Sequence, residues 1–174
     1  MEGNVHIIKE NKIGRIQFFH PKGNCLPTHL LKALVDALET LDKDAQTHVV
    51  ILESNGNAFC AGASLSELKA VKNIAEGTAF FMGFAVLLNT LRKMSKFVLA
   101  RVHGKVVGGG VGLVAACDYA FATAASEIKL SELSIGLGPY VIEPAVSRKM
   151  GTTTFAQLSL NSEYWKSAEW GLEK

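Results

Sequence analysis

The sequence predicts a single α/β domain, residues 1–174, in which buried parallel strands alternate with helices. Two continuous apolar runs, residues 48–53 and 97–102, have the length of strands that are buried on both faces. A segment with helical periodicity, residues 76–95, lies between them. Strands that are connected through a helix pair in parallel with a right-handed crossover, so this order predicts an α/β sheet. With 174 residues, 48% of them hydrophobic, the chain has the size of one compact domain.

Ahead of the first buried strand, the chain is expected to form a β-hairpin and then an amphipathic helix. Residues 5–9 and 13–18 are β-prone, and Asn11 and Lys12 between them suit a tight turn. Thr28 is expected to be the N-cap of the helix that follows. The apolar face of that helix is a set of leucines at helical spacing: Leu30, Leu31, Leu34, Leu38 and Leu41.

The second half of the chain continues the alternation. After the strand at 97–102, the pattern predicts a helix at 109–117, a strand at 119–122 and then helical segments, with Pro144 near a helix start and a break at Gly151. Ligands of parallel sheets bind at the carboxyl ends of the strands. A site is therefore expected in the loops that follow the two buried strands.

Composition argues against several classes of protein. The net charge is +2 and the 18 Lys and Arg residues are dispersed, so we expect no nucleic-acid partner. The longest apolar stretches, such as 106–116, are shorter than a bilayer requires, and the N-terminus lacks a secretory pattern, so we expect a cytoplasmic protein without a membrane span. Cys25, Cys60 and Cys117 are far apart, which indicates reduced thiols. No Cys or His pair has the spacing of metal ligands, so no metal site is predicted.

Two loops are rich in small residues. Residues 57–64 follow the first buried strand, and small side chains there would let a ligand approach backbone N–H groups, although a tight packing turn has the same pattern. Residues 103–113 follow the second, with glycine at four of five positions, 108–112. Glycine is entropically expensive to order, so this loop indicates a site where the backbone approaches a ligand closely.

One alternative is a dinucleotide site. Residues 110–115 fit the G-x-G-x-x-A pattern, and Glu132 lies twenty residues beyond Gly112, where a ribose-binding acid would fall. That pattern normally occupies the first strand-to-helix turn of its domain. Here a substantial α/β segment precedes it, which disfavours the alternative.

Three segments in order, residues 58–63, 103–118 and 131–139, resemble the crotonase (enoyl-CoA hydratase/isomerase) superfamily. The resemblance implies a spiral of ββα units with parallel sheets and a helical C-terminal part, which here is expected to be truncated. It also implies an acyl-CoA substrate, no cofactor other than the coenzyme A of that substrate, and assembly as a homotrimer or a dimer of trimers. The parent activity would be hydration of a 2-enoyl-CoA.

The resemblance also assigns residues. The oxyanion-hole donors fall on the backbone N–H groups of Ala63 and Gly109, and Glu132 matches the second of two glutamates that hydratases of the family use. The first glutamate falls on Gly112, which has no side chain. One general acid/base is therefore expected instead of two. The substrate-binding set expected from these motifs is Cys60, Ala61, Gly62, Leu65, Gly108, Gly110, Pro139, Tyr140 and Glu143.

Three assignments stay open at this point. Glu143 would be a replacement carboxylate or an ordinary acidic residue at a helix N-terminus, and Tyr140 would touch substrate or only pack. His103 is expected to be a structural hydrogen-bonding residue. The rival functions are a dehydratase, isomerase or decarboxylase of a branched or carrier-protein-bound acyl thioester, and a catalytically silent acyl-CoA-binding module.

Overall fold

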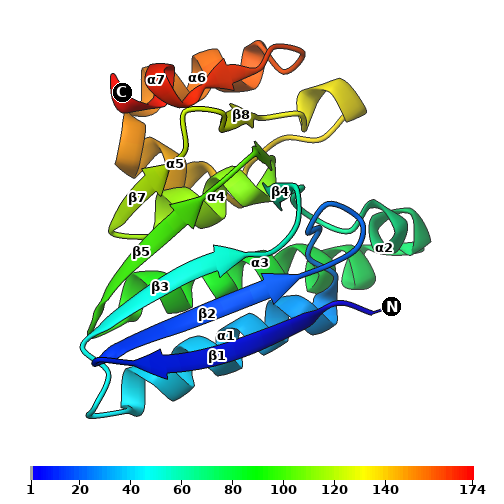
Figure 1. Ribbon diagram of the computed structural model, residues 1–174. Coiled ribbons are helices and arrows are strands. Elements are labelled where there is room, and N and C mark those ends of the chain that lie inside the picture. Colours follow the sequence, from blue (N-terminus) through cyan, green and yellow to red (C-terminus); the bar gives the residue numbers. More distant parts are fainter. Residues whose placement is uncertain (1) are drawn as a thin grey trace.

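The computed structural model describes residues 2–174 as two β-sheets with helices packed against them (Figure 1). The larger sheet has the order β1-β2-β3-β5-β7, and all its neighbouring pairs except β1–β2 are parallel. The predicted α/β class is therefore confirmed. Its strands are β1 (Asn4–Glu10), β2 (Ile13–Phe19), β3 (Val49–Ser54), β5 (Phe97–Val102) and β7 (Tyr119–Ala122).

The hairpin of β1 and β2 forms at the turn that the sequence predicts. Asn11 and Lys12 have φ angles of 48° and 67°, and Glu10 pairs with Ile13 across the turn. Two consecutive residues with positive φ give the turn a twist that matches the flanking antiparallel strands. The polar Asn11 tolerates this conformation better than a β-branched residue would.

A second, smaller sheet has the order β4-β6-β8-β9; the resemblance implied more than one sheet, but none of these four strands was predicted individually. In the spiral, β3 is followed by β4 and then by helices, and β5 is followed by β6 and then by a helix. This repetition is the ββα arrangement that the resemblance implied. The smaller strands are β4 (Ala58–Cys60), β6 (Lys105–Val107), β8 (Glu127–Lys129) and β9 (Lys166–Ser167).

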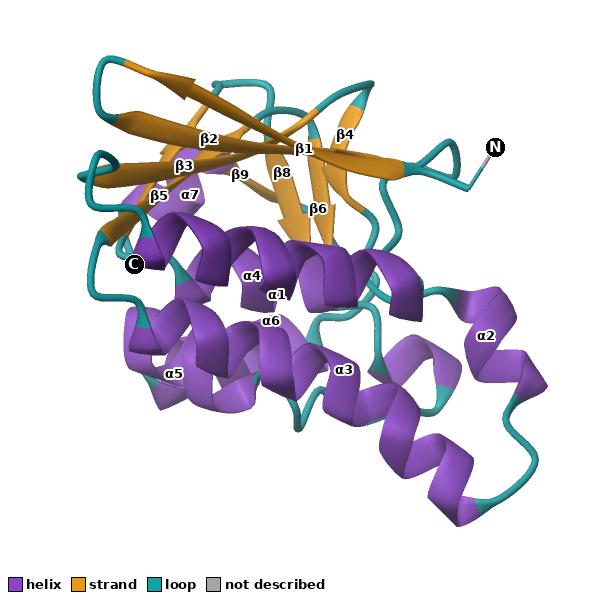
Figure 2. Cartoon of the chain, turned by 90° about the horizontal axis from the view of Figure 1, so that it is seen from below, coloured by secondary structure: helices purple, strands orange, loops and turns teal. Residues whose placement is uncertain are grey.

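Helices cover one face of the larger sheet. Figure 2 shows α1 and α3 side by side against that face, and the two helices pack on each other. The helices are α1 (Thr28–Lys43), α2 (Leu65–Ala70), α3 (Ile74–Lys93), α4 (Gly109–Ala116), a 3₁₀ helix (Leu133–Ile135), α5 (Glu143–Met150), α6 (Thr152–Leu160) and α7 (Ala168–Leu172).

The predicted N-cap of α1 is wrong by one residue. Pro27 holds the cap position in an extended conformation, and Thr28 is the first helical residue. The N–H and hydroxyl of Thr28 both donate to Oε2 of Glu67, at 2.9 and 2.8 Å, so a carboxylate from α2 accepts the bond in place of a local cap. A carboxylate at this end of a helix also complements the helix dipole.

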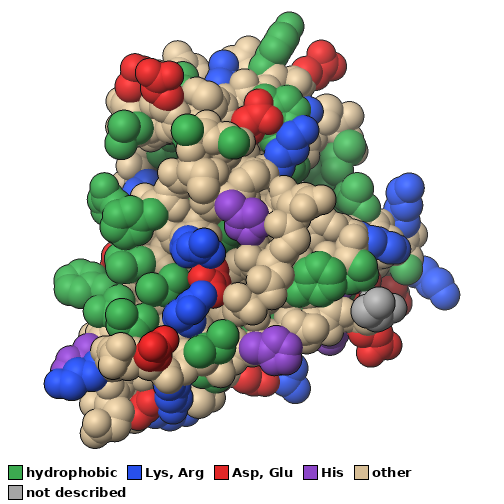
Figure 3. All heavy atoms as spheres, in the orientation of Figure 1, with side chains coloured by type: hydrophobic (Ala, Val, Ile, Leu, Met, Phe, Trp, Pro, Cys, Tyr) green, Lys and Arg blue, Asp and Glu red, His purple; other side chains and the backbone are tan. Residues whose placement is uncertain are grey.

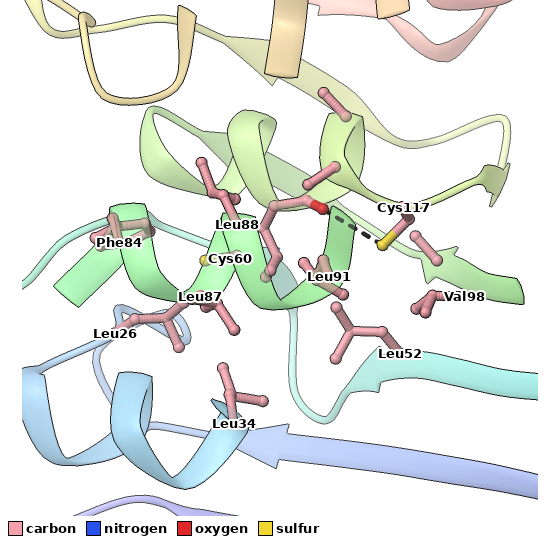
Figure 4. Packing of buried hydrophobic residues seen from close by; sticks show 14 of the residues in the cluster. Leu26, Leu34, Leu52, Cys60, Phe84, Leu87, Leu88, Leu91, Val98 and Cys117 are labelled. Carbon is pink, nitrogen blue, oxygen red and sulfur yellow. Dashed lines mark hydrogen bonds between the residues drawn. The ribbon is translucent and has the colours of Figure 1, made fainter. Parts of the chain in front are cut away.

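The core is one cluster of apolar side chains that draws on both sheets and on α1, α3, α4 and α5. Leu34 of α1 and Leu87 of α3, both fully buried, point into the space between these two helices (Figure 4). In the same view, the thiol of Cys117 donates to the carbonyl of Leu113 at 3.4 Å. The leucines that were predicted to form the apolar face of α1 are all buried.

The three cysteines are free thiols. Burial raises the pKa of both Cys60 and Cys117 to about 12. Cys25 is half-buried, and its Sγ lies 3.2 Å from Nδ1 of His20. Burial raises the pKa of the Cys25 thiol and lowers that of the His20 imidazole, so the pair is held neutral rather than as thiolate and imidazolium.

The outer face of the larger sheet, away from α1 and α3, is open to solvent. Phe97, Tyr119 and Phe121, which we call the outer aromatic cluster, are 69%, 55% and 61% exposed. Figure 3 views this face and shows hydrophobic side chains gathered over β5 and β7. Near the cluster lies Glu53, which is fully buried and ion-paired with Arg15 (2.5 Å) and Arg101 (3.3 Å).

Within residues 2–174, one helix, α3, is long and apolar enough to cross a membrane, with a mean hydropathy of 1.5. A core helix of a globular fold meets the same test. In the fold, α3 packs through five buried side chains: Phe80, Phe84, Leu87, Leu88 and Leu91. The absence of a membrane span stays a prediction.

Candidate active site

The two glycine-rich loops meet at one edge of the smaller sheet. β4 and β6 are parallel, so the segments that follow Cys60 and Val107 emerge on the same side. A Cβ atom placed on Gly62 would lie 2.8 Å from the carbonyl oxygen of Val107 and 3.1 Å from the amide nitrogen of Gly109. Gly62 also has a φ of +82°, so close approach and backbone conformation both require glycine there.

The two backbone N–H groups assigned as oxyanion donors belong to these loops. Gly109 is the first residue of α4, where a helix leaves its N–H groups without partners from the helix itself. Among residues 2–174, neither the N–H of Ala63 nor that of Gly109 donates to any turn, loop or cap bond. Both groups are thus available to an acceptor supplied by a ligand.

The carboxyl group of Glu132 lies beside the same loops. A Cβ atom on Gly108 would lie 2.9 Å from Oε1 of Glu132, and Oε2 is buried without a hydrogen-bond partner in the described part of the chain. Burial raises the pKa of Glu132 above its usual value because water no longer solvates the charged form. A carboxyl group with these properties can exchange a proton with a substrate nearer to neutral pH than an exposed glutamate can.

A cavity of about 200 Å³ joins these groups. Eight of the sequence-predicted site residues line it: Ala61, Gly62, Ala63, Leu65, Gly108, Gly109, Glu132 and Pro139. Apart from Ser131 and Gly138, the remaining wall is apolar and comes mainly from α3 and the segment before α5. It includes Phe80, Phe81, Phe84, Leu68, Val107, Ile135, Leu137, Val141 and Ile142.

Four of the predicted site residues do not line this cavity. Cys60 is fully buried and lies beneath it against Gly110, where an added Cβ would be 2.7 Å from the Cys60 carbonyl oxygen. Tyr140 is 81% exposed, and its ring packs against the backbone of Gly138. Glu143 is the first residue of α5, a position where an acidic side chain is favoured by the helix dipole.

Sequence reasoning missed the apolar wall, and Ile142 above all. A Cβ atom on Gly112 would lie 2.5 Å from Cγ2 of Ile142 and 3.5 Å from Cδ1 of Leu88. Ile142 therefore fills the space beside Gly112 where the resemblance would place a glutamate. Ile142 comes from a segment thirty residues further on, so spacing along the chain carried no sign of the contact.

Within residues 2–174, no group of three or more His, Cys, Asp and Glu side chains is arranged to hold a metal ion. Nε2 of His103 lies 2.8 Å from the carbonyl oxygen of Gly56, which fits the structural role predicted for it.

Known proteins are similar to this chain over most of its length. The family model described as Enoyl-CoA hydratase/isomerase matches residues 8–172. A short-chain-enoyl-CoA hydratase of Clostridium acetobutylicum is 29% identical over 169 residues, which are 95% of this chain and 64% of that protein. An ethylmalonyl-CoA decarboxylase of Xenopus tropicalis is 30% identical over 139 residues, 79% of this chain and 46% of that protein.

Solved structures give the same fold. An enoyl-CoA hydratase from Mycobacterium smegmatis superimposes with a TM-score of 0.90 at 28% identity, covering 95% of this chain and 65% of that one. The chain spans 60%, 43% and 64% of the length of three curated relatives that it matches.

Proposed function

Since the chain belongs to the enoyl-CoA hydratase/isomerase family, we propose that it acts on the thioester of an acyl-CoA through an enolate intermediate, most simply in the hydration of a 2-enoyl-CoA. The observation that carries this proposal is the meeting of the Ala63 and Gly109 loops beside the buried carboxyl group of Glu132. Coenzyme A enters only as part of the substrate, and no further cofactor is proposed.

The two N–H groups are proposed to hold the thioester oxygen. Charge collects on that oxygen as the enolate forms, so two fixed donors stabilise the transition state more than the substrate. Removal of one such donor typically raises the barrier by about 2.7–4 kcal/mol. Because both groups are backbone amides, held by glycine-rich turns, their direction is set by the fold and not by a flexible side chain.

Glu132 is proposed to move the proton. In hydration, the oxygen of water bonds to C3, Glu132 accepts a proton from that water, and the C2–C3 double-bond electrons move to the thioester oxygen as the enolate. Glu132 then returns the proton to C2. One carboxyl group can complete this cycle, and its raised pKa favours the first step, in which Glu132 accepts the proton from water.

A second candidate is decarboxylation of a carboxyacyl-CoA. Among residues 2–174, Glu132 is the only acidic residue that lines the cavity, and Ile142 replaces any group at position 112 that would help hold a water molecule. In decarboxylation, the bond between C2 and its carboxylate breaks, carbon dioxide leaves, and the electron pair forms the same enolate. Protonated Glu132 then supplies one proton to C2, and no bound water is needed.

The test is a pair of assays on the same preparation. Crotonyl-CoA hydration is followed by loss of the conjugated thioester absorbance, and ethylmalonyl-CoA decarboxylation by release of carbon dioxide. Hydration that is lost in Glu132→Gln supports the first candidate, and decarboxylation without hydration supports the second. Acyl-CoA binding without either reaction supports a silent acyl-CoA-binding module. Absence of acyl-CoA binding, or tight NADH binding instead, overturns the proposal.

We further propose assembly as a trimer or a pair of trimers in a reducing, cytoplasmic setting. Exposure of the outer aromatic cluster supports association, because parallel sheets are normally covered on both faces. Three free thiols support the reducing compartment. Sedimentation of the purified chain tests the assembly, and a monomer at all concentrations would contradict it.

A further inference from the structure

A second cavity, of about 190 Å³, lies between α3, α5 and the end of α4. Each long helical wall presents residues spaced by three, four and seven positions, which is one face of a helix. On α3 the face ends at Asn89 and Arg92, and on the other wall it runs from Val141 to Arg148. The rest of the lining is apolar or small, including Leu88 and Pro144.

Arg92 and Arg148 both line this cavity, and in the described part of the chain no acidic side chain lines it with them. Among residues 2–174, none of the four ion pairs includes either guanidinium. Both arginines lie in the last turn of their helix, where the helix dipole favours a cation. The dipole accounts for their positions along the helices, but not for two like charges lining the same small space.

We propose that this cavity binds a carboxylate group through Arg92, Arg148 and Asn89, with a short apolar stem against Leu88 and Pro144. Guanidinium groups match a carboxylate with paired, parallel hydrogen bonds, and the amide of Asn89 adds a neutral donor. The apolar floor selects an organic acid over a bare inorganic anion, because a fully hydrated ion gains nothing from apolar contact.

The carboxylate has two possible sources. Val141 lines both cavities, so the second cavity adjoins the proposed acyl-CoA cavity at this residue. A carboxylate at the far end of an acyl chain would reach the arginines past Val141, and a free short-chain acid would enter from solvent, to which both arginines are exposed. Binding of the free acid does not depend on the proposed enzymatic function.

The first experiment titrates the full chain with butyrate and follows backbone amide resonances of α3 and α5. We expect saturable shifts around Ala85 and Ala145, and none with butyramide, which has the same shape without the charge. Arg92→Gln and Arg148→Gln should each weaken binding about 10-fold. Lys93→Gln is the matched control, because it removes a neighbouring exposed cation outside the cavity and should leave the affinity unchanged.

The second experiment compares glutaryl-CoA with pentanoyl-CoA, which has the same chain length and no terminal carboxylate. Tighter binding of glutaryl-CoA that is lost in Arg148→Gln assigns the carboxylate to the acyl chain, and butyrate binding without that preference assigns it to a free acid. The proposal is overturned if butyrate binds no better than butyramide and the two thioesters bind alike. Failure of both thioesters to bind would instead count against the proposed function, since the butyrate titration stands alone.

Discussion

Ile142 occupies the volume into which a side chain at position 112 would extend, with its Cγ2 atom 2.5 Å from where the Cβ of residue 112 would be. Gly112 lies within α4, and Ile142 immediately precedes α5, where it is 4% exposed. The absence of a side chain at Gly112 therefore leaves room for the large side chain of Ile142 where these helices pack together. A carboxylate at position 112 requires a smaller residue at position 142.

The first prediction is that Gly112→Glu and Ile142→Ala compensate each other. Gly112→Glu alone overpacks the α4–α5 contact and should lower the free energy of unfolding by about 1–3 kcal/mol. Ile142→Ala alone leaves a cavity and should lower it by about 2–5 kcal/mol. In the double variant the loss should be smaller than the sum of the two, as urea unfolding of all four proteins would show. Strict additivity would mean that the two side chains do not compete for space.

The second prediction concerns Glu132 and Glu143. Glu132→Gln should lower turnover about 10²- to 10⁴-fold, because the amide cannot exchange a proton, while acyl-CoA binding is retained. Glu143→Gln should leave turnover within about twofold, because Glu143 lies outside the cavity at a helix start. Steady-state rates measure turnover in the two variants, and the dissociation constant of a saturated acyl-CoA measures whether binding is retained. Equal losses in the two variants would show that Glu143 serves as the replacement carboxylate.

The third prediction is a pH dependence of stability that Glu132 causes. Its folded-state pKa is raised by burial, so between its ordinary value near 4.5 and the raised value the folded protein binds more protons than the unfolded chain. Stability must then fall as pH rises through that window and level off above it. The wild type should lose stability relative to Glu132→Gln across this window in parallel urea titrations. A difference that is constant with pH would show that Glu132 is not desolvated.

The long elements could be predicted because burial on one or both faces leaves a periodic or continuous apolar pattern. β3 and β5 read as mainly apolar runs, interrupted by Glu53 and Arg101, and α1 shows its face through five leucines. The strands of the smaller sheet have two or three residues, too few to show a period. Their pairing comes from contacts between distant segments, which local sequence does not encode.

The candidate site also has a part that could be predicted from the sequence and a part that could not. The family resemblance assigned Ala63, Gly109 and Glu132, and the structure brings all three to one cavity, while their catalytic roles stay predictions. The opposite wall was missed, because Phe80 and Phe84 look like ordinary core residues of a helix. The contact of Ile142 with Gly112 could not be predicted either, since glycine gives no indication of which distant side chain fills the space beside it.

The fourth prediction is that Gly108→Ala damages both stability and activity. Gly108 has φ +54° and ψ −120°, a region that residues with a Cβ rarely adopt, and an added Cβ would lie 2.9 Å from Oε1 of Glu132. Strain of this kind typically costs about 1–3 kcal/mol. Gly171→Ala is the control, because nothing lies within 4 Å of its Cβ position and its helix should tolerate alanine. Thermal unfolding and turnover are measured for both variants. If Gly108→Ala loses no more stability or turnover than Gly171→Ala, the backbone at Gly108 is not strained by a Cβ atom.

The last prediction concerns the link between α1 and α2. Glu67 accepts hydrogen bonds from the N–H and hydroxyl of Thr28, whereas α2 itself contains no buried residue. Since Leu65 and Leu68 of this helix line the cavity, the link holds part of the cavity wall in place.

Glu67→Ala should therefore raise the KM for acyl-CoA several-fold while kcat changes less, because the chemistry on Glu132 is untouched. Amide hydrogen exchange of residues 65–70 should speed up, and global stability should fall by only about 0.5–1.5 kcal/mol, as for an ordinary hydrogen bond. Lys69→Ala, an exposed change on the same helix, should do neither. If exchange in α2 is the same in both variants, the helix is held by its packing on α3 and the Thr28–Glu67 bond has no part in shaping the site.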